Sequence, residues 1–128
     1  MPLSKRLHLL LAIILLAGIT ILLVIPGSAF PSENWMSSIQ LDKWIHIFLF
    51  AILVIMWVTA MWKNYPTVTS FHKLSVSVAC IAVIYGISME IVQHYFVTNR
   101  SFELNDIFAD LAGSLIGYLL LMSRYIKK

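Results

Sequence analysis

Four apolar runs, each long enough to cross a membrane, constrain the fold of this chain more than any other feature. They cover residues 7–25, 44–62, 74–92 and 107–126. A helix rises about 1.5 Å per residue, so about 20 residues cross a hydrocarbon core about 30 Å thick. Only 12% of the residues are charged, whereas about a quarter are charged in a typical soluble domain. The runs predict an all-α, polytopic membrane protein whose four transmembrane helices form a small antiparallel bundle.

The first run has two interpretations. Lys5 and Arg6 precede it and residues 27–29 are small, as at a signal-peptide cleavage site. A secretory core has about 7–15 residues, whereas this uninterrupted run is long enough to span by itself, so retention as an anchor is favoured. Residues 1–128 are expected to form one membrane domain, because no repeat or soluble segment interrupts the runs. Residues 31–35 are predicted to open a short interfacial helix.

The basic residues indicate which helix ends face the cytoplasm. Lys43 and Arg100 lie on one side of the predicted bundle, and the other side holds seven of the nine: Lys5, Arg6, Lys63, Lys73, Arg124, Lys127 and Lys128. Positive residues concentrate on the cytoplasmic side of a membrane protein. The chain is therefore expected to lie in the bacterial cytoplasmic membrane with both termini in the cytoplasm. The net charge of +3 then reflects topology and contact with anionic lipid. Membrane lipids are the expected partners, no nucleic-acid partner is expected, and no motif specifies an oligomer.

All six acidic side chains lie within residues 33–42 and 90–110, in the connections on the predicted outer side and in the adjoining ends of the runs. A carboxylate in a hydrocarbon-bounded site is costly unless it is paired, protonated or hydrated, so such a cluster indicates a functional site. Residues three or four apart share a helix face, so each of the last three helices presents a polar edge at one depth. The candidates for an outward-facing pocket are Asp42, Lys43, His46, Glu90, Gln93, Arg100, Asp106 and Asp110.

Small residues at every fourth position predict how two of the helices pack. Apolar contact between helices gains little over contact with lipid, so association relies on close approach at small residues. The third run contains Ala82 and Gly86, and the fourth contains Ala109, Gly113 and Gly117. These faces predict that the third and fourth helices pack against each other. Asp110 shares the glycine face, so it is expected to point into the bundle.

Simpler roles are also open for several of these residues. Asp42 and Asp106 suit helix N-caps, because aspartate accepts hydrogen bonds from the free amides of a first turn. Lys43 suits a snorkelling role, with its ammonium among lipid head groups, and His94 and Glu103 are expected as loop residues in water. His46 and Glu90 lie about one turn inside their runs, where water is scarce. They are therefore the candidates for catalytic residues.

The polar motifs follow one another in a distinctive order. Residues 42–46 read Asp-Lys-Trp-Ile-His and residues 90–93 read Glu-Ile-Val-Gln, followed by Arg100, Asp106, Gly113 and Gly117. This order resembles the VanZ-like family, named for an accessory protein of teicoplanin resistance, across residues 41–118. The resemblance implies a role in the cell envelope, with resistance as a family label. Asp110 departs from the asparagine that many members carry there.

Two classes of function fit these residues. One is a binding protein whose pocket takes the polar head of a lipid or lipoglycopeptide-like compound, with Lys43 and Arg100 facing phosphate or carboxylate. The other is a membrane enzyme acting on an envelope lipid, in which Glu90 and His46 transfer protons. The sequence shows no serine or cysteine nucleophile beside a base, so binding is favoured.

The acidic residues that are expected to share the pocket need a positive partner or a proton. Glu90, Asp106 and Asp110 would repel one another in one poorly hydrated space, so at least one should hold a proton, Arg100 or a metal ion. No cofactor is predicted, although Asp42, Asp106 or Asp110 could hold a divalent cation through oxygen ligands. Zinc is disfavoured, because the only nitrogen ligands nearby are those of His46 and His94.

Overall fold

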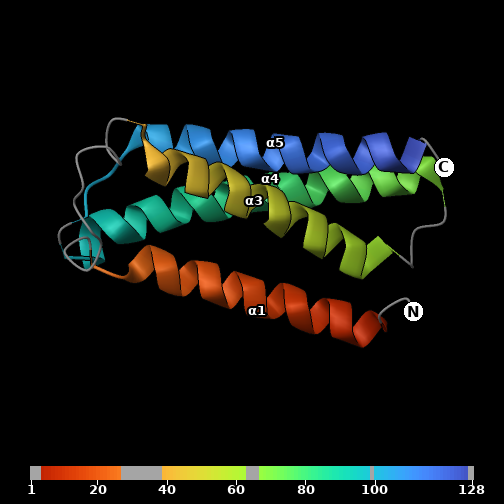
Figure 1. Ribbon diagram of the computed structural model, residues 1–128, viewed down its shortest axis with the longest axis horizontal. Coiled ribbons are helices and arrows are strands. Elements are labelled where there is room, and N and C mark those ends of the chain that lie inside the picture. Colours follow the sequence, from red (N-terminus) through yellow and green to blue (C-terminus); the bar gives the residue numbers. More distant parts are fainter. Residues whose placement is uncertain (1–3, 27–38, 63–66, 99, 127–128) are drawn as a thin grey trace.

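A computed structural model describes residues 4–26, 39–62, 67–98 and 100–126, and these residues form four helices (Figure 1). The helices are α1 (Lys5–Val24), α3 (Leu41–Met61), α4 (Val68–Phe96) and α5 (Leu104–Ile126). Each is long and apolar enough to cross a membrane. Successive helices run in opposite directions, so both termini lie at one end of the bundle. The predicted all-α, multi-pass membrane architecture is confirmed.

Local side-chain chemistry marks several helix ends. Ser4 caps α1 by accepting a hydrogen bond from the Leu7 N–H at 3.3 Å, and Thr67 caps α4 by accepting one from the Ser70 N–H at 3.1 Å. The first helix ends before Pro26, because the residue that precedes a proline is disfavoured in the helical region. These caps and breaks set the helix limits more closely than hydropathy does.

The third span is longer than hydropathy predicts. Helix α4 has 29 residues, whereas the apolar run covers residues 74–92. It extends beyond this run at both ends and includes Lys73 before it and His94, which was expected in a loop, after it. Polar side chains at its two ends lower the hydropathy but are compatible with a helix whose ends reach the membrane interface. The interfacial helix predicted at residues 31–35 lies outside the described residues.

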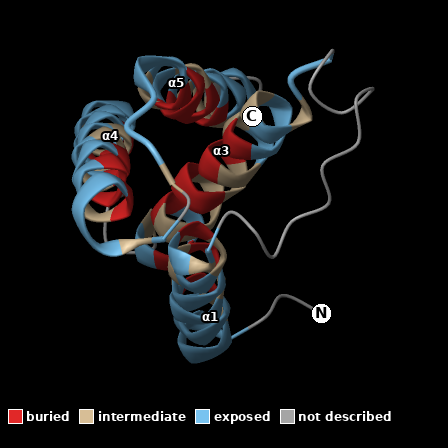
Figure 2. Cartoon of the chain, turned by 90° about the vertical axis from the view of Figure 1, so that its left-hand side faces the viewer, coloured by how far each residue is buried: buried red, intermediate tan, exposed pale blue. Residues whose placement is uncertain are grey.

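Helix α3 contacts each of the other three helices and has the most extensive interhelical contacts of the four. Its buried face carries Phe50, Val54 and Val58. Figure 2 shows that the buried faces of α3, α4 and α5 turn towards one another, while the outward faces are exposed. These outward faces carry leucine, isoleucine and phenylalanine, which suits contact with lipid.

The glycines of α5 lie against α3. A Cβ atom placed on Gly117 would lie 2.7 Å from the carbonyl oxygen of Ala51, and one on Gly113 would collide with the carbonyl oxygen of Ile47. The predicted pairing of the third and fourth helices through their small residues is therefore wrong for Gly113 and Gly117. Gly86 of α4 does face α5, because a Cβ atom there would lie 2.5 Å from a carboxylate oxygen of Asp110.

Candidate functional site

Lys43 lies among three carboxylates at the end of the bundle that holds the start of α3, the end of α4 and the start of α5, here called the outer end. Its Nζ atom lies 2.6 Å from Asp42 Oδ2 and 2.5 Å from Asp106 Oδ1, and it also pairs with Glu103. The Lys43 side chain is only 14% exposed. It therefore joins the start of α3 to the start of α5 and does not simply snorkel to head groups.

His46 lies one turn further along α3 and pairs with Asp110. Its Nδ1 atom lies 2.7 Å from Asp110 Oδ1, and both side chains are buried. Its Nε2 atom lies 4.0 Å from Asp106 Oδ2, which is too far for a direct hydrogen bond. Since Gly86 has no side chain, α4 leaves room for the Asp110 carboxylate. The arrangement fixes the imidazole through one nitrogen and leaves the other for a further partner.

Glu90 connects α4 to the same group of residues. It is 1% exposed, and its Oε2 atom accepts a hydrogen bond from the backbone N–H of Glu103 at 3.1 Å. Glu103 in turn pairs with Lys43. Three helices thus contribute to one connected set, here called the outer cluster: Asp42, Lys43, His46, Glu90, Glu103, Asp106 and Asp110.

Gln93 and Arg100 have different contacts from those expected. The Gln93 side-chain amide donates to the carbonyl of Leu23 at 2.8 Å, and Arg100 Nε donates to the carbonyl of Ile25 at 3.3 Å. Carbonyls at the end of a helix lack partners within that helix, so these two side chains satisfy the end of α1. Both were predicted to line the ligand pocket. Their described hydrogen bonds instead hold α1 against the rest of the bundle.

The simpler roles considered for the acids are also revised. The N-cap of α3 is Gln40, and Asp42 is the second residue of that helix. Asp106 is the third residue of α5. Neither aspartate is a cap, although negative charge in a first turn is favourable near the positive end of the helix dipole.

Two polar residues in or beside the outer cluster were not among the predicted site residues. Glu103 does precede α5, but it contacts both Lys43 and Glu90. Its position three residues before Asp106 was the available signal. Ser114 is buried one turn after Asp110, and its hydroxyl has no hydrogen-bond partner among the described residues. Serine is common in membrane helices, so no pattern in the sequence distinguishes Ser114 from the others.

The outer cluster contains more acids than bases. Five carboxyl groups face one lysine and one histidine, so full ionisation would leave an excess of negative charge. Such a site favours bound protons or a cationic ligand. Oxygens of Asp42, Glu103 and Asp106 lie within 4.8 Å of one another, and oxygen ligands suit Ca²⁺ or Mg²⁺. The Lys43 ammonium is paired with these same three carboxylates, so a metal ion would compete with it.

The sequence matches the family model described as VanZ/LLP1 over residues 9–126. The match includes most of α1, the other three helices and every residue of the outer cluster. No curated protein and no solved structure matches the chain. The resemblance seen in the order of the polar motifs is therefore confirmed at the level of the family.

Proposed function

Because the chain belongs to the VanZ/LLP1 family, we propose that it is a protein of the bacterial cytoplasmic membrane whose outer cluster binds the polar head of an envelope amphiphile. The observation that carries this proposal is the convergence of ionisable side chains from three membrane-spanning helices at one end of the bundle. Polar groups inside a membrane protein usually mark a ligand or substrate path. Lipid and lipid-tailed compounds present both an apolar tail and a polar head to such a site.

The contacts of the cluster refine which head group it suits. Lys43 already pairs with three carboxylates, so it does not support recognition of a phosphate at this end, and the Nε–H of Arg100 donates to a backbone carbonyl at the end of α1. Ionised carboxylates accept hydrogen bonds and attract cations. The proposed ligand therefore offers amines, amides or hydroxyl groups. Teicoplanin, the lipid-tailed glycopeptide associated with the VanZ name, is a candidate of this chemical type.

A membrane enzyme that acts on an envelope lipid is the second candidate. It is favoured by the His46–Asp110 pair, since a carboxylate at 2.7 Å orients the imidazole and leaves Nε2 available for proton transfer. Glu90 would be the other acid or base. In this version the same outer cluster holds the substrate head group.

Binding and turnover can be separated with purified protein and an envelope lipid extract. The binding proposal predicts saturable retention of unmodified lipid by the wild type and loss of retention in His46→Ala and Glu90→Gln. His94→Ala is the matched control, because His94 is exposed in the last turn of α4, and it should retain lipid normally. Covalent turnover that disappears in Glu90→Gln would instead support the enzyme. Wild-type retention in both cluster variants would remove the site from consideration.

The orientation in the membrane is part of the proposal. Of the basic residues that the structure describes, Lys43 and Arg100 belong to the outer end, whereas the end that carries the two termini holds four: Lys5, Arg6, Lys73 and Arg124. Positive residues favour the cytoplasmic side. A reporter enzyme fused after Lys128 should therefore be active in the cytoplasm. Activity outside the cell would place the outer cluster in the cytoplasm and contradict the proposed access from the envelope.

A further inference from the structure

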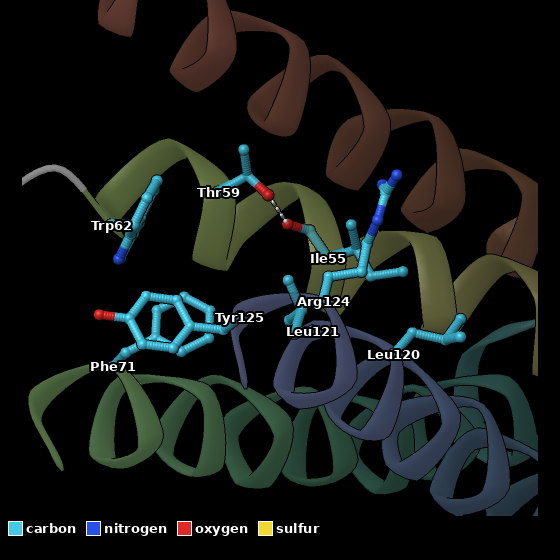
Figure 3. Close-up of a pocket in the computed structure, with 8 residues that line it drawn as sticks. All are labelled: Ile55, Thr59, Trp62, Phe71, Leu120, Leu121, Arg124 and Tyr125. Carbon is cyan, nitrogen blue, oxygen red and sulfur yellow. Dashed lines mark hydrogen bonds between the residues drawn. The ribbon is translucent and has the colours of Figure 1, made fainter. Parts of the chain in front are cut away.

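The opposite end of the bundle, where both termini lie, contains a groove of about 710 Å³ between α3, α4 and α5 (Figure 3). Its volume lies within the range of about 300–1,000 Å³ that is typical of ligand pockets. This end, here called the inner end, is separate from the outer cluster and shares no residue with it. The groove therefore calls for an explanation of its own.

Aromatic rings form one wall of this groove. Phe71 and Tyr125 stack with their centroids 4.3 Å apart, and Trp62 packs edge-on against both rings at 5.9 and 5.7 Å. Thr59 adds no free hydroxyl, because its oxygen donates to the carbonyl of Ile55 at 2.6 Å. The wall is thus apolar and held in place by ring packing, as a surface for a hydrocarbon chain would be.

Arg124 is the charged residue at the edge of the groove. Its guanidinium lies away from the aromatic rings in Figure 3 and is exposed. It makes no hydrogen bond or ion pair with any described residue. All six acidic residues of the sequence lie at positions 33–42 or 90–110, so the segments that form the inner end contain no carboxylate side chain to neutralise it.

We propose that this groove binds an anionic phospholipid, with an acyl chain against the rings of Trp62, Phe71 and Tyr125 and the phosphate on Arg124. Two observations argue for this occupant: the apolar wall lies in the membrane-spanning segments or directly beside them, and the inner end has positive charge without acidic side chains. Guanidinium binds phosphate with paired hydrogen bonds, and basic residues near a membrane surface attract anionic lipid. The proposal does not depend on the function of the outer cluster.

Fluorescence quenching by brominated lipid tests the occupant directly. A protein in which Trp62 is the sole tryptophan (Trp35→Phe, Trp44→Phe, Trp57→Phe) is reconstituted into vesicles of phosphatidylglycerol and phosphatidylcholine in equal parts. Two preparations are compared: in one the phosphatidylglycerol has brominated acyl chains, and in the other the phosphatidylcholine has them. Phosphatidylglycerol should occupy the groove about fivefold more strongly than phosphatidylcholine, from the attraction of one basic residue. Brominated phosphatidylglycerol should accordingly be the stronger quencher.

Three variants sharpen the test. Arg124→Gln should remove the preference for phosphatidylglycerol, and Thr59→Phe should reduce quenching by both lipids because it fills the groove. Lys73→Gln, which removes an exposed base that does not line the groove, should retain the preference. A matched protein whose sole tryptophan is Trp44, exposed at the outer end, should show no preference.

Several outcomes would overturn the proposal. Equal quenching of Trp62 by the two lipids would do so, as would a preference that survives Arg124→Gln. Quenching that falls as the protein density rises would point to a second copy of the chain in the groove. If the protein with a sole tryptophan does not fold, the same preference is measured by native mass spectrometry on the wild type and on Arg124→Gln, as phosphatidylglycerol retained relative to phosphatidylcholine.

Discussion

The two ends of the bundle join the same helices by different interactions. At the outer end, ionisable groups link α3, α4 and α5, with Lys43 among three carboxylates and His46 on Asp110. At the inner end, the contacts are between the stacked and edge-on rings of Trp62, Phe71 and Tyr125. Removing one partner of a buried ion pair leaves the other charge buried and unpaired. Replacing one aromatic ring by a smaller side chain removes only the contacts of that ring. The outer end should therefore be much the more sensitive to single substitutions.

The path of α3 explains why the two ends differ. Helix α3 lies against α5 at the outer end and diverges from it towards the inner end (Figure 1). Gly113 and Gly117 lie where the backbones approach most closely, against Ile47 and Ala51. Beyond them the larger side chains of the inner end fill only part of the widening space. One tilt thus gives a close ion-paired junction at one end and a groove at the other.

The largest expected effect is that of Lys43→Met. The substitution removes the cation that the buried Asp106 shares with Asp42 and Glu103, so three neighbouring carboxylates lose their common partner. The free energy of unfolding should therefore fall by about 3 kcal/mol. Reversible unfolding in mixed micelles measures this change. Lys73→Met is the control, because Lys73 is exposed at the inner end, and it should change the value by less than about 0.5 kcal/mol. Similar losses in the two variants would contradict the contrast between the ends.

Gly113→Ala should have the next largest effect, a loss of about 2 kcal/mol in the same measurement. The added methyl would collide with the Ile47 backbone and force α5 away from α3. Gly18→Ala is the matched control, since a Cβ atom there has no atom within 4 Å. If the two alanine variants were equally stable, the close approach of α3 and α5 would be wrong.

Phe71→Leu tests the inner end. It removes the stacking with Tyr125 and the edge contact with Trp62, which should lower the free energy of unfolding by about 1 kcal/mol. Phe96→Leu changes a ring that is exposed at the end of α4 and should have almost no effect. A loss from Phe71→Leu as large as that from Lys43→Met would remove the difference in sensitivity between the ends.

Thr20→Val should have the smallest effect, a loss of about 0.6 kcal/mol, which is typical of a hydrogen bond between membrane helices. The Thr20 hydroxyl lies 2.6 Å from the Tyr85 hydroxyl and links α1 to α4. Thr59→Val is matched to it, because the Thr59 hydroxyl bonds within its own helix. A greater loss from Thr59→Val than from Thr20→Val would mean that this link to α1 does not stabilise the bundle.

The sequence predicts the number and direction of the helices well, because long apolar runs have few alternatives in a membrane. It predicts less well where a helix ends, as α4 shows, since polar residues at its ends remain helical. It also does not identify packing partners. The small residues of α5 indicate a face that permits close approach, but whether α3 or α4 lies on that face depends on the tilt of the whole bundle.

The outer cluster is likewise only partly predictable. Helical spacing gives the depth of Gln93, and Arg100 was expected at the pocket as an outer basic residue, whereas the described hydrogen bonds of both side chains go to the end of α1. Glu103 was passed over because a residue outside the runs is expected in water. The groove at the inner end could not be predicted at all, since its lining comes from three helices and its size depends on their divergence.

A double-mutant cycle of Lys43→Met and Asp106→Asn tests the ion-paired junction of the outer end most directly. Lys43 Nζ and Asp106 Oδ1 lie 2.5 Å apart, and both side chains are little exposed. The free energies of unfolding of the wild type, the two single variants and the double variant should therefore give a coupling energy of about 2 kcal/mol. A coupling indistinguishable from zero would show that Lys43 and Asp106 are not partners, and that the helices do not converge on one cluster.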